Sequence, residues 1–145
     1  EFTFSSYQNL SERTNLRLYT HLGGSKGIDS LQYKWFYSRG MSDFVGAEMY
    51  ELSWKKFMIF RLDLRHEVLP GWYLNLSYNN APNPVWEGNR LYPPKVRILN
   101  GYGIGILYDS YIGPIQFTLS LGDKLNADDT KTLRPLGYFS VGLNF

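Results

Sequence analysis

The feature that most constrains the fold is a strict alternation of apolar residues with small or polar ones. Between Pro114 and Gly122, every second residue is apolar, and the residues between them are Gln, Thr, Ser and Gly. Because successive side chains of a β-strand point to opposite faces, this pattern gathers the apolar side chains on one face. The same alternation recurs at 2–7, 15–22, 57–69, 72–79, 99–110 and 138–145. The sequence therefore predicts an all-β, antiparallel fold.

Length and charge exclude several classes of protein. The 145 residues are enough for one domain, and no run of ~18 apolar residues predicts a membrane-spanning helix. The net charge is +2, with 15 basic and 13 acidic residues interleaved, so we expect no nucleic-acid partner. The absence of cysteine excludes disulfides and thiolate chemistry in this chain. The chain opens at Glu1 without a signal segment, and we therefore expect a fragment of a longer protein.

The segment 57–69 has one apolar face and one charged face. The charged side chains are those of Arg61, Asp63, Arg65 and Glu67. In a soluble sheet they would face water. The apolar faces of the other segments, however, end in Tyr or Trp, at Trp72, Tyr78, Tyr102, Tyr108 and Tyr111. A lipid-facing band with aromatic girdles and a polar lumen is typical of transmembrane β-barrels, so we predict that these four charges face a lumen.

The predicted connections between strands alternate between short and long. The short ones fall at 9–14, 69–71 and 109–113, and the long ones at 23–56, 80–97 and 122–136. Transmembrane barrels combine tight periplasmic turns with long extracellular loops. We therefore expect the long segment 23–56 to be extracellular or folded back into the lumen, and the C-terminus to be periplasmic.

About seven strands are predicted, or eight if 31–37 forms another. Seven strands cannot close a barrel, and an unpaired strand edge in lipid costs several kcal/mol per backbone group. The chain 1–145 is therefore predicted to be the C-terminal half of a larger barrel. Two alternatives stay open: a complete eight-stranded barrel with lipid-modifying activity, and a soluble β-sandwich that acts as a binding module.

One stretch resembles a known signature. Residues 36–46 resemble the long sixth-loop pattern F-Y-x-G-G-x-x-x-V-R-G of the outer-membrane barrel assembly and surface-antigen superfamily. Residues 60–65 and 72–78 are most similar to the branch in which this barrel is fused behind a patatin-like phospholipase. The signature falls on Phe36, Tyr37, Gly40, Val45 and Gly46. The resemblance covers about 31–145, and it implies a bacterial outer-membrane barrel of about sixteen strands that is an anchor or a translocation pore.

The sequence departs from this signature at an ion pair. The arginine of the family's loop falls on Val45, and its acidic partner falls approximately on Asn79. Loss of one partner would leave a buried charge at a cost of several kcal/mol, whereas loss of both can be nearly neutral. The departure therefore weakens an assembly or translocation role more than it weakens the fold.

The C-terminal segment resembles the signal by which outer-membrane barrels are recognised for insertion. Its alternating residues are Phe139, Val141, Leu143 and the terminal Phe145. The resemblance implies that the barrel assembly machinery is a partner. Outer-membrane lipid and upstream strands, from the same protein or from another chain, are the other partners that we expect.

No segment predicts catalysis, a cofactor or a metal site in this chain. A G-x-S-x-G sequence at 23–27 precedes an alternating Tyr/Trp segment rather than a helix, so it is interpreted as a turn. His21 and His66 are interpreted as structural, and the acidic residues in 123–129 lack the spacing of a calcium loop. The glycines in 101–105 recur with period two, which predicts relief of crowding on the inner wall rather than a phosphate loop. Any phospholipase activity of the parent protein would reside upstream.

Overall fold

The computed structural model describes residues 1–24, 36–39, 44–54, 56–84, 96–125 and 131–142. These residues contain nine β-strands and no helix, which confirms the all-β prediction. The strands are β1 (Phe2–Ser11), β2 (Thr14–Gly24), β3 (Phe36–Arg39), β4 (Met49–Trp54), β5 (Lys56–Leu69), β6 (Trp72–Pro84), β7 (Val96–Ser110), β8 (Gly113–Leu125) and β9 (Lys131–Val141). Within the described residues, no helix is long and apolar enough to span a bilayer.

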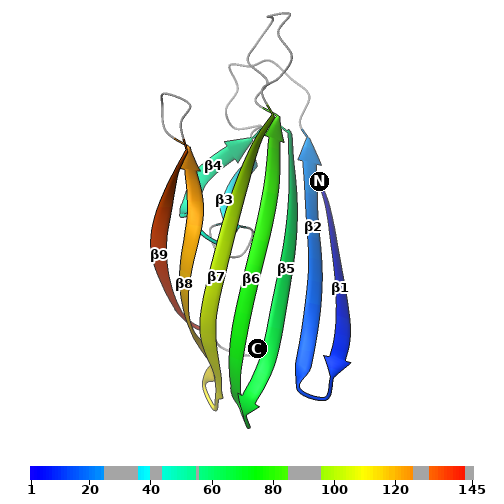
Figure 1. Ribbon diagram of the computed structural model, residues 1–145, viewed down its shortest axis with the longest axis vertical. Helices are drawn as coiled ribbons and strands as arrows, with labels where there is room; N and C mark the ends of the chain where they lie inside the picture. The colour runs from blue at the N-terminus through cyan, green and yellow to red at the C-terminus, as the bar shows by residue number, and fades with distance from the viewer. Residues whose placement is uncertain (25–35, 40–43, 55, 85–95, 126–130, 143–145) are drawn as a thin grey trace, which may run out of the picture.

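Seven of these strands form one antiparallel sheet in the order β1-β2-β5-β6-β7-β8-β9 (Figure 1). Each strand pairs with its neighbour along the chain, apart from the interruption by the separate hairpin of β3 and β4. The sheet is open, and β1 and β9 form its two edges. The antiparallel arrangement is thus as predicted from sequence, whereas a closed barrel is not seen in this chain.

The two ends of the sheet differ in how the strands are joined. At one end, here named the turn end, two residues each join β1 to β2, β5 to β6 and β7 to β8. Gly71 and Gly113 have φ values of 77° and 113° there, which glycine adopts without strain. The opposite end, named the loop end, carries the connections through 25–55, 85–95 and 126–130 (Figure 1).

The register of the sheet gathers apolar residues on one face, named the outer face. Leu76 lies opposite Ile104, and Ile104 lies opposite Leu119. Ile104 and Leu119 remain 52% and 54% exposed. The other face, named the inner face, buries small and polar residues such as Thr118 and Ser120. In a soluble antiparallel sheet the apolar face packs on the core, whereas here the face with the continuous apolar alternation is exposed.

A second layer covers the inner face near the loop end. It consists of residues 44–48, which lie between β3 and β4 in the chain. Phe44 and Ala47 of this segment form the main buried apolar cluster together with residues of β5, β6 and β7: Phe57, Ile59, Ala81 and Leu99. The core of the described structure therefore lies between the sheet and a segment that the sequence predicted only as a long connection.

Some strand boundaries differ from the prediction. β9 begins at Lys131, whereas the sequence predicted a start at 138. Pro135 and Gly137 lie on its outer face and interrupt the apolar alternation, but the pairing with β8 continues through both residues. β1 continues past the predicted 2–7 and ends at Ser11. Of the possible extra strand at 31–37, residues 31–35 lie outside the described residues, and the remaining two begin β3, which pairs with β4 rather than with the main sheet.

Candidate functional site

Two aromatic pairs bracket the apolar band of the outer face. Trp72 and Tyr108 lie opposite each other on β6 and β7 at the turn end, with stacked rings whose centroids are 4.5 Å apart. Tyr78 and Tyr102 form the equivalent pair toward the loop end, at 5.3 Å. From Tyr102 to Tyr108 the strand advances by about 20 Å, at ~3.4 Å per residue. Aliphatic residues fill the interval: Leu74, Leu76, Ile104 and Ile106.

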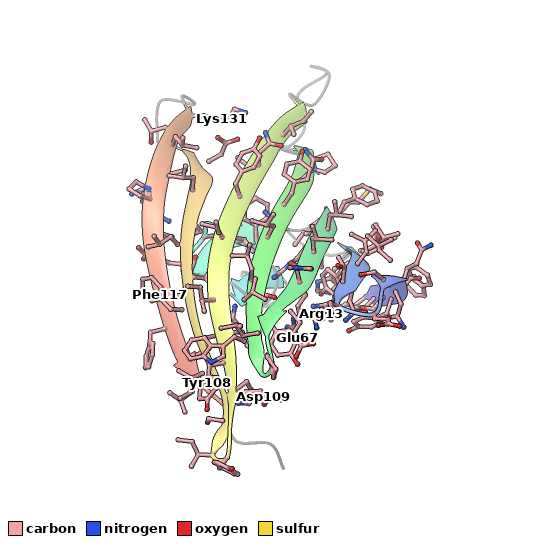
Figure 2. All side chains as sticks on the ribbon, turned by 60° about the horizontal axis from the view of Figure 1, so that its bottom comes forward. Arg13, Glu67, Tyr108, Asp109, Phe117 and Lys131 are labelled. Carbon is pink, nitrogen blue, oxygen red and sulfur yellow. The ribbon has the colours of Figure 1, made fainter. Side chains whose placement is uncertain are left out.

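Polar residues flank this band at both ends of the sheet. At the loop end, the backbone N–H of Asn100 donates to Asp123 Oδ2 at 2.9 Å, and Lys131 Nζ lies 3.5 Å from the same carboxylate. At the turn end, the Thr14 hydroxyl and His66 Nδ1 lie 2.9 Å apart. Figure 2 shows Lys131 at the loop end and Tyr108 at the turn end of the sheet. The outer face is thus apolar between the two aromatic pairs and carries polar contacts near both ends, where Ile98, Leu133, Leu69 and Ile112 are exposed as well.

The inner face holds residues 44–48 through one buried side chain. The Val45 backbone N–H donates to Asn79 Oδ1 at 2.8 Å, and Asn79 Nδ2 donates to the Val45 carbonyl at 3.3 Å. Both residues are essentially inaccessible to solvent. The two positions to which the sequence resemblance assigns an ion pair are therefore in contact, and a neutral amide–peptide pair stands in its place.

Glycines on β7 and β8 make room for this segment. A Cβ atom on Gly101 would overlap the Val45 carbonyl oxygen, and one on Gly103 would lie 2.6 Å from Val45 Cγ1. Gly46 has a φ of 95°, and a Cβ there would lie 2.5 Å from the Gly122 Cα. The backbone of the segment thus packs directly against the backbone of β7 and β8. This packing agrees with the prediction that the β7 glycines relieve crowding on the inner wall.

Further contacts tie the segment to β9. The Tyr138 hydroxyl donates to the Ala47 carbonyl at 2.7 Å, and Arg134 Nη1 lies 3.5 Å from Glu48 Oε1. Of the remaining signature residues, Phe36 and Tyr37 lie in β3, and Gly40 lies outside the described residues. The structure therefore places Val45 and Gly46 at the centre of the docked segment.

The predicted charged face of β5 lies on the inner face. Asp63 accepts hydrogen bonds from Arg61 Nε at 2.8 Å and from the Ser77 hydroxyl at 2.6 Å. Arg17 Nη1 on β2 lies 3.7 Å from the same carboxylate. Sequence reasoning missed Arg17, although the predicted alternation in 15–22 already placed it on the polar face. Further along β5, Arg65 Nε donates to Asn75 Oδ1 at 3.0 Å.

Glu67, the fourth residue of the predicted charged face, forms its contacts at the turn end of the sheet. Glu67 Oε1 accepts the backbone N–H of Gly71 at 3.2 Å, and the Glu67 backbone N–H donates to the Arg13 carbonyl at 2.8 Å. Glu67 therefore closes the turn between β5 and β6 and links it to the neighbouring turn. Of the four predicted charged residues, Arg61, Asp63 and Arg65 line the open part of the inner face.

The two histidines lie on opposite faces. His21 is buried on the inner face, where its Nε2 lies 2.7 Å from Glu1 Oε1 and its ring meets the edge of Phe57 at 4.6 Å. His66 is on the outer face beside Thr14. Ser25 of the G-x-S-x-G sequence lies outside the described residues. The described residues hold no group of three or more potential metal ligands.

The C-terminal residues are placed in part. Phe139 and Val141 lie on the outer face of β9, and both side chains are exposed. Leu143 and Phe145 lie outside the described residues. β9 is an edge strand, so the segment that resembles an insertion signal borders an unpaired edge of the sheet.

Comparison of the chain with known protein families, curated proteins and solved structures finds no match.

Proposed function

We propose that this chain is part of a transmembrane β-barrel in a bacterial outer membrane, where it acts as a membrane anchor or translocation pore. One observation carries the proposal: the apolar side chains of the outer face form a continuous exposed band between two aromatic margins, while the opposite face holds the polar and glycine residues and a local apolar cluster under residues 44–48. Outer-membrane barrels show this arrangement because lipid contacts the outside and water or protein fills the inside.

The arrangement argues against a soluble β-sandwich. In a sandwich, the second layer covers the apolar face of the sheet. Here the second layer is the segment 44–48, which lies on the glycine-rich inner face over a local apolar cluster and, in the described part of the chain, leaves the continuous apolar band of the outer face uncovered. The apolar face of β7 has no covering layer among the described residues, so lipid is the environment that suits it.

The strand count argues against a complete eight-stranded barrel. The described residues supply seven strands to the sheet, and β3 and β4 pair only with each other. In lipid, the free edges of β1 and β9 require partner strands. We therefore favour a larger barrel of about sixteen strands, completed by strands of the same protein or of another chain and inserted by the barrel assembly machinery.

The contact between Val45 and Asn79 supports the resemblance to the surface-antigen superfamily, because two positions assigned from the sequence alone are in contact. Residues 44–48 occupy the inner face at the loop end, and this favours an anchor, or a pore that opens when the segment leaves. In this proposal no catalysis resides in the chain, and an upstream patatin-like domain would carry any phospholipase activity.

Single-cysteine labelling of the intact protein in cells tests whether the sheet crosses the membrane. Lys124→Cys lies near the loop end, and Tyr111→Cys lies in the fully exposed turn between β7 and β8. A membrane-impermeant maleimide is expected to label Lys124→Cys in intact cells, and Tyr111→Cys only after the outer membrane is permeabilised. Equal labelling of both variants in intact cells would contradict a membrane-crossing sheet.

A further inference from the structure

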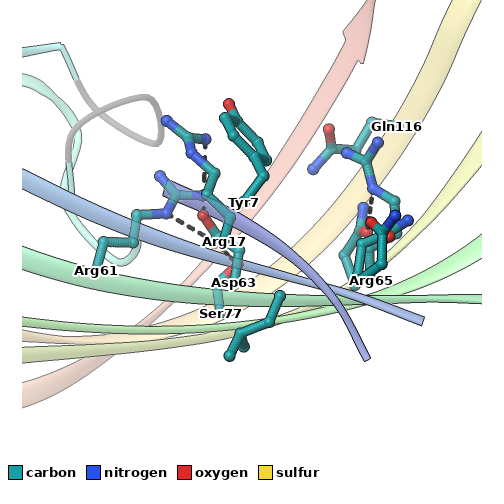
Figure 3. A pocket seen from close by; sticks show the side chains of 11 residues that line it. Tyr7, Arg17, Arg61, Asp63, Arg65, Ser77 and Gln116 are labelled. Atoms are coloured by element: carbon teal, nitrogen blue, oxygen red, sulfur yellow. Dashed lines mark hydrogen bonds and ion pairs between the residues drawn. The ribbon is translucent and has the colours of Figure 1, made fainter. Parts of the chain in front are cut away.

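The inner face contains an open polar hollow toward the turn end, away from residues 44–48. Its volume is about 610 Å³, and β1, β2, β5, β6 and β8 form its walls (Figure 3). Its lining includes three arginines and one carboxylate: Arg17, Arg61, Arg65 and Asp63. Three guanidinium groups against one carboxylate leave two positive charges in excess, since every other residue that lines the hollow is neutral.

The carboxylate of Asp63 is partly engaged: Oδ1 accepts hydrogen bonds, whereas the buried Oδ2 has an ion-pair contact but no hydrogen-bond partner among the described residues. It accepts from Arg61 and Ser77, and Arg17 lies 3.7 Å away at ion-pair distance. Figure 3 shows Arg17 and Arg61 converging on Asp63, with Arg65 beside Gln116 on the other side of the hollow. One carboxylate thus contacts two arginines, and the cluster as a whole keeps a net positive charge.

Arg17 and Arg65 retain unused donors. A guanidinium has five N–H donors. In the described part of the chain, the Arg17 side chain has an ion pair with Asp63 but no hydrogen bond, and its buried Nε has no partner. Arg65 donates there only from Nε to Asn75. The buried Nε of Arg17 is costly to leave without a partner, whereas Arg65 is exposed and its free donors face the hollow and solvent; an anion in the hollow would accept from both arginines.

Both arginines can reach one ligand. Arg17 is the register partner of Asp63, and Arg65 is the next residue along β5 on the same face. Diagonal neighbours of this kind lie ~7–8 Å apart, which is within reach of two long side chains. The rings of Tyr7 and Tyr73 lie 5.8 Å and 5.7 Å from the Arg17 and Arg65 guanidinium carbons. These rings restrict the orientation of the guanidinium groups.

From this geometry we infer that the hollow is a binding site for a phosphate dianion, held between Arg17 and Arg65. A dianion balances the excess charge of the cluster, and the planar guanidinium fork matches phosphate oxygens. Inorganic phosphate, a soluble phosphate monoester and a lipid whose headgroup is a phosphate monoester share this chemistry. The site uses only inner-face residues and does not depend on whether the sheet crosses a membrane.

Calorimetric titration of the intact protein in maltoside detergent with inorganic phosphate, at constant ionic strength set by chloride, tests the site. We expect saturable binding by the unmodified protein and at least a ten-fold loss of affinity in Arg17→Gln and in Arg65→Gln. Arg13→Gln is the matched control, because Arg13 is exposed in the turn between β1 and β2 and does not line the hollow. Its phosphate affinity is expected to equal that of the unmodified protein.

Asp63→Asn separates a charge effect from misfolding. The asparagine oxygen can still accept from Arg61 and Ser77, while the excess charge of the hollow rises, so phosphate affinity is expected to increase several-fold. A purely structural role of the cluster predicts that affinity falls instead. The inference is overturned if the unmodified protein binds no phosphate, if Arg17→Gln and Arg65→Gln bind it as well as Arg13→Gln does, or if Asp63→Asn weakens binding.

A second titration in mixed micelles containing phosphatidic acid, whose headgroup is a phosphate monoester, identifies the source of the phosphate group. If a lipid phosphate occupies the hollow, the apparent affinity for inorganic phosphate falls in the mixed micelles with the unmodified protein. If the ligand is a soluble phosphate, the affinity stays the same. Both results are compatible with the shared chemistry, and each assigns it to one source.

Discussion

The side-chain amide of Asn79 forms hydrogen bonds with both the N–H and the carbonyl of Val45, although the two residues are 34 positions apart in the sequence. This buried amide links the sheet to the segment 44–48, beside the contacts of Tyr138 and Arg134 with the same segment. Because both ends of the pair are neutral, no charge is buried where the superfamily signature has an arginine and a carboxylate.

Replacement of Asn79 by leucine is expected to detach the segment. The substitution leaves the buried N–H and carbonyl of Val45 without partners, at a cost of about 2 kcal/mol in the free energy of unfolding. Chymotryptic cleavage after Phe44, which is fully buried, should become faster, as followed by mass spectrometry. Asn15→Leu is the control, because Asn15 is on the same face but exposed. Unchanged cleavage in Asn79→Leu would show that the pair does not hold the segment.

Substitution of the glycine seat should have a similar effect by a steric route. A Cβ at Gly101 would overlap the Val45 carbonyl, and backbone cannot turn aside as the end of a side chain can. Gly101→Ala is therefore expected to accelerate cleavage after Phe44. At Gly137 on β9, the nearest atom to an added Cβ is Leu119 Cδ2 at 3.9 Å, so Gly137→Ala should leave cleavage unchanged. Equal cleavage of the two variants would contradict the proposed seat.

Much of this architecture was predictable from the alternation of residue types. The strands β5 to β8 follow the predicted segments closely, because their apolar residues recur with period two and register then aligns them. The start of β9 was missed because Pro135 and Gly137 fall on its apolar face. Resemblance indicated Val45 and Asn79 as a pair, but alternation alone could not show that residues 44–48 return to the sheet.

The phosphate hollow was predictable only in part. Arg61, Asp63 and Arg65 share a face by simple spacing, and that face was identified from the sequence. Arg17 joins them through the register of β2 against β5, which places it opposite Asp63. Both strands were predicted from the sequence. That β2 pairs with β5 was not defined by local pattern, because a connection of some thirty residues, about 25–55, separates them.

The aromatic pair at the turn end should be energetically coupled. Trp72 and Tyr108 stack at 4.5 Å with an interplanar angle of 28°, and such pairs contribute about 0.5–1.5 kcal/mol beyond area burial. A double-mutant cycle with leucine at both positions, measured by urea unfolding in lipid vesicles, is expected to show this coupling. Trp72 and Tyr102 lie at opposite margins of the band and should behave additively. Additivity of the Trp72 and Tyr108 substitutions would mean that the stacking contributes nothing to stability.

Arginine scanning compares the two faces within one strand. Phe117 is exposed on the outer face of β8, whereas its neighbour Gln116 lines the inner hollow. Phe117→Arg is expected to destabilise the protein in lipid vesicles by about 2–4 kcal/mol, and Gln116→Arg by much less, because arginine is costly on the lipid side and not in a water-filled interior. In a protein surrounded by water, Phe117→Arg would instead be tolerated at least as well as Gln116→Arg.

The central claim, that the outer face contacts lipid, is tested most directly by spin-label accessibility in the intact protein reconstituted into vesicles. The chain lacks cysteine, so Leu119→Cys and Gln116→Cys each introduce one label site in it, on the outer and inner face respectively. Any cysteine elsewhere in the intact protein would first be replaced. The account predicts that the label at 119 collides with oxygen and is shielded from a water-soluble nickel complex, whereas the label at 116 is accessible to nickel. Equal nickel accessibility of both labels in the folded protein would contradict it.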